Sequence, residues 1–204
     1  MKTRLLALLL PLTLLAPLAA QEMAKPGPQH QKLAANAGTW DAAIEMMGPD
    51  GKMQPSKGVS VQAMGPGGFW LLDNFNADLG GAPFHGMGST GFDPQKGKYV
   101  GTWIDSMSPA LMVLEGDFDA TGKVLTMTGT SPGFDGKPAV HRMVTTYVDA
   151  KTNRFEMFVT GSDGKEMKLL SITYTRRGEA GGKGKDHGGE PAKEQGARPR
   201  NGGK

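Results

Sequence analysis

The stretch LAANAGTWDAAIEMM, residues 33–47, leads from a short helix-like segment into the first clear strand pattern of the chain. From the tryptophan onward, apolar and polar side chains alternate with a period of two, which is typical of a strand buried on one face. One face carries Trp40, Ala42, Ile44 and Met46, and the other carries Asp41 and Glu45. The stretch therefore predicts a half-buried strand that begins at Gly38.

Turn signals recur along the following 120 or so residues at intervals of about ten. They are GPDG, GPGG, DLGGAP, DPQKG, MSPA, DATG, SPGFDG, DAKTN and SDG. Their residues reach turn dihedral angles at little cost, so the nine turns divide the body into ten short segments. The only helix candidate is QHQKLAANA, residues 29–37. We predict ten antiparallel strands closed into an up-and-down barrel, because closure removes two exposed edges.

A short helix followed by Gly-x-Trp at the start of the first strand resembles the signature of lipocalins and other calycin barrels. The resemblance implies that Trp40 plugs the closed end and that an arginine of the last strand, Arg176 or Arg177, lies across its face. A second Gly-Thr-Trp ends at Trp103, but the residues after the two copies do not align. We therefore interpret one copy as a structural signature and the other as coincidence.

Four segments in order, AGTWD, GFDPQKGKYVGTWIDSMS, LEGDFDATGKVLTMTG and DGKEMKLLSITYTRR, resemble the bacterial family catalogued as domain of unknown function 1579. The resemblance covers about residues 30–177. It implies a calycin-like barrel without an established activity, and it supplies no catalytic residues.

The two ends of the chain have a different composition. Residues 1–20 combine two basic residues with an apolar run that ends in small residues, which predicts a secretory signal peptide and a periplasmic or secreted protein. Residues 21–37 form an N-terminal segment with the capping helix, and residues 38–177 form the barrel. Residues 178–204 are rich in Gly, Lys, Arg, Glu and Pro, so we expect a disordered basic tail.

Charge and composition exclude several classes of protein. Residues 21–175 carry thirteen basic and sixteen acidic side chains, so the high isoelectric point comes from the tail. The body is therefore not expected to bind nucleic acid, while the tail can contact anionic surfaces weakly. The chain has no cysteine, hence no disulfide, and no second apolar run, so we expect no stable membrane insertion.

Two catalytic motifs fail on inspection. GTSPG, residues 129–133, has the form of a hydrolase nucleophile elbow, but Pro132 lacks the N–H that an oxyanion hole needs. GMGSTG, residues 86–91, has the dinucleotide-binding spacing, but a turn follows it instead of a helix. Nothing in the sequence indicates that any two of three carboxylates lie close enough for acid–base catalysis: Asp73, Asp105 and Asp117. An enzyme with its site at the barrel mouth remains an alternative.

We predict no metal and no cofactor, because His85 and His141 are the only histidines of the body and have no ligand spacing. A haem-binding barrel similar to nitrobindin, with one of them as the proximal ligand, is a further alternative.

We predict that the barrel binds a small apolar or amphipathic molecule. In VHRMVTTYV, residues 140–148, Arg142 shares a face with three valines and would need a partner such as a ligand carboxylate if that face points inward. The alternative is that Arg142 points to solvent and Arg176 only covers Trp40. The candidate ligand-binding residues are Trp70, Trp103, Arg142, Phe155, Met157, Tyr174 and Arg176.

Overall fold

The computed structural model describes residues 24–178, except residues 49, 134 and 162. The predicted signal peptide and the predicted basic tail lie outside the described residues. The helix α1 spans Pro28–Ala34, and a single 3-10 turn spans Pro66–Gly68. The strands are β1 (Gly38–Met47), β2 (Met53–Met64), β3 (Trp70–Leu79), β4 (Ala82–Asp93), β5 (Lys98–Asp105), β6 (Ser108–Phe118), β7 (Val124–Pro132), β8 (Pro138–Asp149), β9 (Thr152–Thr160) and β10 (Glu166–Arg176).

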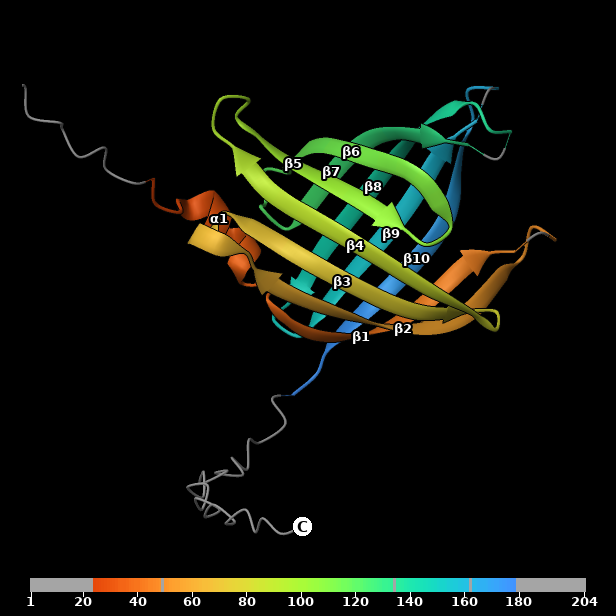
Figure 1. Cartoon of the computed structure of the whole chain (residues 1–204), viewed down its shortest axis with the longest axis horizontal. Coiled ribbons are helices and arrows are strands. Elements are labelled where there is room, and N and C mark those ends of the chain that lie inside the picture. The colour runs from red at the N-terminus through yellow and green to blue at the C-terminus, as the bar shows by residue number, and fades with distance from the viewer. Residues whose placement is uncertain (1–23, 49, 134, 162, 179–204) are drawn as a thin grey trace, which may run out of the picture.

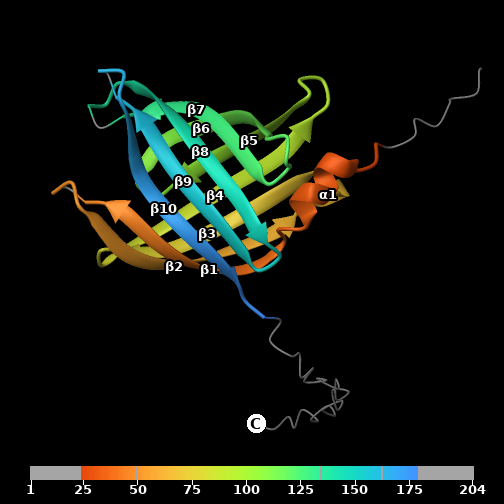
Figure 2. The same ribbon diagram turned by 180° about the vertical axis from the view of Figure 1, so that it is seen from behind.

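The ten strands form one closed antiparallel barrel in which each strand pairs with its neighbours in the sequence (Figure 1). The first and last strands close it, because β1 pairs with β10 from Trp40 opposite Arg176 to Met46 opposite Leu170. Figure 2 shows this pairing from behind. The predicted ten-stranded barrel is confirmed, and each of the nine strand connections falls on one of the predicted turn motifs.

Alternation along the strands separates the interior of the barrel from its outer surface. In β1 the tryptophan face is the buried one, since Trp40, Ala42 and Ile44 are each 3% exposed or less. In β8 the face of His141, Met143 and Tyr147 points inward: His141 is buried, and the other two pack against a buried core cluster. The valine face of β8 is therefore the outer one.

Two apolar clusters fill the barrel along its axis. The first, next to α1, includes Leu71, Tyr99 and Leu125, and the second, nearer the other end, includes Ile44 and Phe75. The side chain of Trp103 packs against both clusters. The interior is thus lined continuously by apolar and aromatic side chains.

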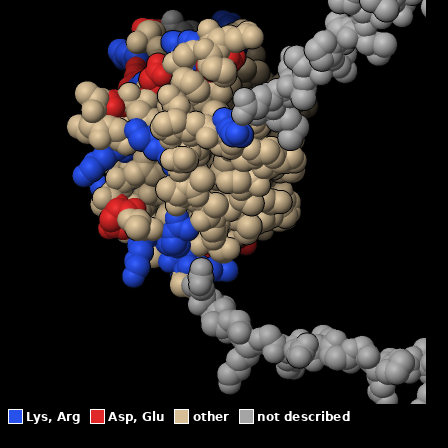
Figure 3. Space-filling model, turned by 90° about the vertical axis from the view of Figure 1, so that its left-hand side faces the viewer, with Lys and Arg blue, Asp and Glu red and all other residues tan. Residues whose placement is uncertain are grey.

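The helix α1 covers the end of the barrel at which β1 begins (Figure 1). It starts with Pro28, whose fixed φ suits the first helical position, and it buries Leu33 to 1% exposure. The surface at this end consists mainly of uncharged residues (Figure 3). Within the described part of the chain, none of the helices has the length and apolar character needed to cross a membrane.

Candidate functional site

Trp40 lies at the closed end of the barrel beneath α1. Its side chain is 1% exposed, and its indole Nε1 donates a hydrogen bond of 2.9 Å to the carbonyl oxygen of Asn36. The amide of Asn153 on β9 also donates to the side-chain oxygen of Asn36, at 3.3 Å. These contacts tie the segment after α1 to two strands.

Arg176 lies across the outer side of the same indole. The guanidinium carbon is 4.1 Å from the centre of the Trp40 ring. Its nitrogens donate to three backbone carbonyl oxygens, those of Ala37 at 2.6 Å, Ala35 at 2.7 Å and Ala150 at 2.9 Å. Of the two arginines that end the last strand, Arg176 is therefore the one that covers the tryptophan, and its donors are engaged by the protein itself. Beside Arg176, the outer surface of the closed end has a depression of about 230 Å³.

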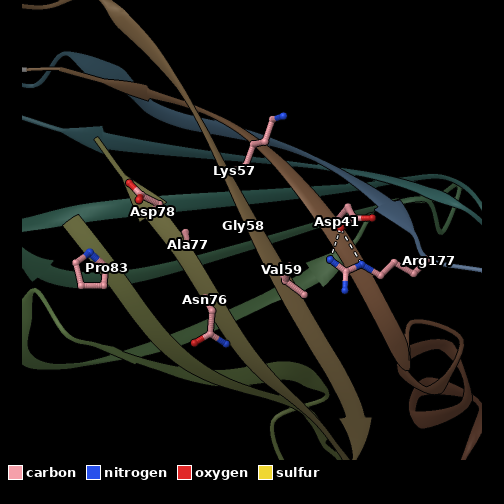
Figure 4. A pocket seen from close by; sticks show the side chains of 9 residues that line it. All are labelled: Asp41, Lys57, Gly58, Val59, Asn76, Ala77, Asp78, Pro83 and Arg177. Carbon is pink, nitrogen blue, oxygen red and sulfur yellow. Dashed lines mark hydrogen bonds and ion pairs between the residues drawn. The ribbon is translucent and has the colours of Figure 1, made fainter. Parts of the chain in front are cut away.

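A second hollow, of about 510 Å³, lies on the surface of β1 to β4 (Figure 4). Arg177 and Asp41 face each other there, with Nη2 of Arg177 2.6 Å from Oδ1 of Asp41. The hydrogen bond from Arg177 lowers the pKa of Asp41. Asp41 and Arg177 are exposed and paired with each other, and the other charged side chains of this groove, Lys57 and Asp78, are exposed as well, so none of its charged groups is buried in a way that would specify a ligand.

Aromatic side chains from four strands meet inside the barrel. The Phe75 ring is the centre of the group, with ring centroids 6.1 Å from Phe84, 6.3 Å from Tyr174 and 6.4 Å from Trp103. The contacts with Phe84 and Tyr174 are edge-to-face, the arrangement that aromatic pairs favour. The four rings form an apolar wall of fixed shape.

Trp103 lies flat against β4 because two glycines leave room for it. A Cβ built on Gly86 would lie 2.2 Å from Cζ2 of Trp103, and one built on Gly88 would lie 3.1 Å from its Cε3. The indole Nε1 donates to Asp105 Oδ2 at 3.0 Å. Glycines close by in the sequence therefore help to fix the position of this large side chain.

Asp73 is a carboxylate on the inner face of β3, between Leu71 and Phe75. Ser60 Oγ donates to its Oδ1 at 2.7 Å, and Gln62 Nε2 donates to its Oδ2 at 3.4 Å. Burial raises the pKa of Asp73 above the ordinary value of 3.8, although these two hydrogen bonds act in the opposite direction. The interior thus holds an acidic group whose hydrogen-bonding partners are neutral.

Tyr174 on β10 brings a second polar group to this region. Burial raises the pKa of its hydroxyl, and the negative charge of Asp73 raises it further. Within the part of the chain that the structure describes, this hydroxyl has no hydrogen-bonding partner. Every fully buried side-chain nitrogen or oxygen in that part does have a partner. The Tyr174 hydroxyl is therefore not completely enclosed by protein atoms.

His141 is the histidine that lies inside the barrel. It is 4% exposed, and its Nδ1 lies 3.1 Å from the carbonyl oxygen of Ala139, which fits a neutral imidazole that carries its proton on Nδ1. Burial lowers its pKa below 6.5. His85, in contrast, is exposed on the outer face, with its Nδ1 against Asn76. Across the described residues, no three His, Asp or Glu side chains group in a way that would hold a metal ion.

The inward-facing side chains at the two ends of the barrel differ in burial. Inward-facing side chains near α1 are almost fully buried, as for Leu71 at 8% and Tyr99 at 5% exposure. Near the β3–β4 and β9–β10 hairpins, the inward-facing side chains of Leu79, Phe84 and Leu170 are only partly buried. The hairpin end is therefore the less tightly closed end of the barrel.

Four of the residues proposed from the sequence, Trp103, Phe155, Met157 and Tyr174, pack against the two interior clusters. Trp70 lies instead on the outer face, 41% exposed, with its ring over Gly91. Arg176 is at the closed end.

Arg142 also lies outside the barrel, which corrects the interior placement considered above. Its guanidinium donates twice to the carboxylate of Glu166, at 2.7 and 2.6 Å, and stacks 4.2 Å from the ring centre of Phe158. The physical reason is that β8 buries Met143 and Tyr147 on its opposite face, so Arg142 keeps its charge paired near water.

Sequence reasoning missed the polar group formed by Ser60, Gln62 and Asp73. The signal for Asp73 was present: in WLLDNFNADL, residues 70–79, it shares its face with Leu71, Phe75, Ala77 and Leu79. A carboxylate at an inward position of an otherwise apolar face indicates a buried polar site.

The chain is similar to several solved structures, the first of which supports the fold. The crystal structure of Rv2717c from M. tuberculosis is similar with a TM-score of 0.58 and 14% identity, covering 74% of this chain and 98% of that one. An S-type phycobiliprotein lyase, CPES from Guillardia theta, gives a TM-score of 0.47 and 10% identity, over 75% of this chain and 99% of that chain. A redesigned β-barrel, mFAP1 bound to DFHBI, gives 0.38 and 18%, over 74% and 100%. Comparison with curated proteins gives no match.

The model of one protein family matches residues 25–176, which is the whole barrel together with α1. The match includes Trp40 and Arg176 at the closed end, and Asp73, Trp103 and Tyr174 in the interior. This chain therefore belongs to the family described as protein of unknown function DUF1579.

Proposed function

We propose that this protein binds a small amphipathic molecule inside the barrel, entering from the hairpin end. Small-molecule sites are typically concave and apolar, with a few polar groups that fix orientation. The aromatic wall around Phe75 and Trp103 provides the apolar part, and Asp73 with Tyr174 provides the polar part.

One observation carries the proposal. The Tyr174 hydroxyl, close enough to Asp73 for the carboxylate charge to act on it, has no hydrogen-bonding partner among the described residues and is not completely enclosed by protein atoms. In a barrel filled only for stability, a polar group at this position would be paired within the protein or replaced by an apolar one. A ligand hydroxyl, amine or carbonyl would supply the missing partner.

Native mass spectrometry tests this proposal. The full chain, purified from its own host, is expected to carry a bound small molecule that is released on denaturation. In the variant Ala77→Phe, an inward-facing side chain fills space in the second cluster, and the bound molecule should be lost. The matched control Ala63→Phe adds the same ring on the exposed face of β2 and should retain it. Retention in both variants, with circular dichroism showing intact strands, would exclude the interior as the binding site.

We also propose that the protein acts outside the cytoplasm. The support is the sequence of residues 1–20, with its basic start, apolar middle and small-residue end. Amino-terminal sequencing of the protein isolated from its host is expected to start at Gln21. Recovery of the protein from the cytoplasmic fraction with Met1 intact would refute export.

A further inference from the structure

The carboxylate of Asp73 has unused capacity to accept hydrogen bonds. A carboxylate offers about four acceptor positions on its two oxygens. Ser60 occupies one at 2.7 Å, and Gln62 makes a longer contact of 3.4 Å with the other oxygen. Both partners are neutral, so the carboxylate can accept further donors from a molecule in the barrel.

None of the cations in the described part of the chain neutralises this carboxylate. No lysine or arginine there forms an ion pair with Asp73. Arg176 donates to backbone carbonyls at the closed end, and Arg142 is paired with Glu166 on the outer face. A negative charge that is partly buried and has no cationic partner is unfavourable, so this site favours a ligand that brings positive charge or a strong donor.

The register of three adjacent strands places an aromatic face beside the carboxylate. Asp73 on β3 is paired with Gly88 on β4, and Gly88 is paired with Trp103 on β5. Because Gly88 has no side chain, the Trp103 indole lies over it, on the inner wall between its own strand and that of Asp73. Phe75 contacts the rings of both Trp103 and Tyr174. An ammonium group at this position would contact a carboxylate and the faces of aromatic rings, both of which attract cations.

We propose that the barrel selects ligands with a protonated amine, whose ammonium group donates to Asp73 while the apolar part lies against Trp103 and Phe75. This inference rests on the proposed function and names its ligand class. It reverses the expectation from the sequence, in which an arginine would bind a ligand carboxylate. The oxygen of the Tyr174 hydroxyl, which has no other hydrogen-bonding partner among the described residues, accepts from the same ammonium group.

Three compounds with one skeleton test the selection: 4-phenylbutylamine, 4-phenylbutanol and 4-phenylbutyrate, which are cationic, neutral and anionic at pH 7. Isothermal titration calorimetry with the full chain should give an affinity for the amine about tenfold or more above that for the carboxylate, as expected for a charge-assisted hydrogen bond. Asp73→Asn should remove this preference while retaining binding of the alcohol.

Two controls separate this effect from general charge and from misfolding. Asp117→Asn makes the same change of charge on the exposed face of β6 and should keep the preference. Tyr174→Phe should weaken the alcohol and the amine together and leave the order amine over carboxylate unchanged.

The outcomes distinguish the two proposals. Equal binding of all three compounds by the wild-type chain overturns the selection by Asp73 but leaves a binding barrel. A preference for the amine that persists in Asp73→Asn also overturns it. Absence of binding for every compound, with no molecule retained from the host, overturns the proposed function as well.

Discussion

Arg176 and Trp40 are register partners on the last and first strands, and the arginine stacks on the tryptophan at a distance of 4.1 Å. The same pair therefore covers the closed end and joins the two strands whose pairing closes the barrel. Arg176 also binds the carbonyl oxygens of Ala35 and Ala37, so the segment between α1 and β1 is held to the end of β10. One side chain therefore contacts both the strand pair that closes the sheet and the segment that follows the helix.

Replacing Arg176 by alanine should destabilise the fold by at least about 2 kcal/mol, because three hydrogen bonds from a charged donor and a cation–π contact are lost together. Urea unfolding followed by circular dichroism measures this. Arg177→Ala is the matched control: it removes the neighbouring arginine, whose pair with Asp41 is exposed on both sides, and should change the unfolding midpoint little. Similar losses in the two variants would show that the stack on Trp40 adds no specific stability.

The contact between Gly86 and Trp103 gives a second prediction. A Cβ at residue 86 would lie 2.2 Å from the indole, so Gly86→Ala must displace Trp103 from the wall of β4. We expect lower stability and a changed near-ultraviolet circular dichroism signal. In a Trp103→Leu background the same glycine substitution should cost much less, since the clashing ring is absent. Additive effects of the two substitutions would contradict this contact.

The fold could be predicted because its signals are local. Each turn motif is set by a few Gly, Pro, Asp or Asn residues, and the alternation in β1 is visible within seven residues. The closed end, with Trp40 beneath an arginine of the last strand, was predicted from Gly38 and Trp40 through the resemblance to calycin barrels. The position of Arg142 did not follow, because alternation defines two faces of β8 without saying which is the inner one. Both faces contain apolar residues, Val140 on one and Met143 on the other.

The polar site in the interior depends on contacts between strands. Ser60 and Gln62 reach Asp73 because β2 pairs with β3 in a register that places Gln62 opposite Asp73. Tyr174 comes close only when β10 closes on β1. Such registers are set by the packing of the whole barrel, so the site could not be assembled from the sequence of any one segment.

Asp73 should give the stability an unusual dependence on pH. Its pKa in the folded protein is raised above 3.8, so in the interval between the two values the folded protein holds a proton that the unfolded chain has lost. Stability contributed by the protonated form is complete below the unfolded pKa and falls as pH rises through the folded pKa. The neutral variant Asp73→Asn lacks this loss, so its stability relative to wild type should increase as the pH rises from about 3.8 through the folded pKa of Asp73.

Urea unfolding of both proteins at a series of pH values measures this difference. Asp117→Asn, on the outer face of β6, controls for the change in net charge. A difference between Asp73→Asn and wild type that stays constant over the whole range would contradict a carboxyl group whose protonation is linked to folding.

His141 should act in the opposite direction and in a different range of pH. Because burial lowers its pKa below 6.5, the unfolded chain takes up a proton on this imidazole at a pH where the folded protein does not. The free energy of unfolding therefore decreases as pH falls from about 7 to 5, and His141→Asn, which keeps a donor for the carbonyl of Ala139, should reduce that decrease. The same substitution at exposed His85 controls for the loss of an imidazole from the chain. If the wild-type and His141→Asn proteins lose stability equally on acidification, the imidazole inside the barrel is not the group that resists protonation.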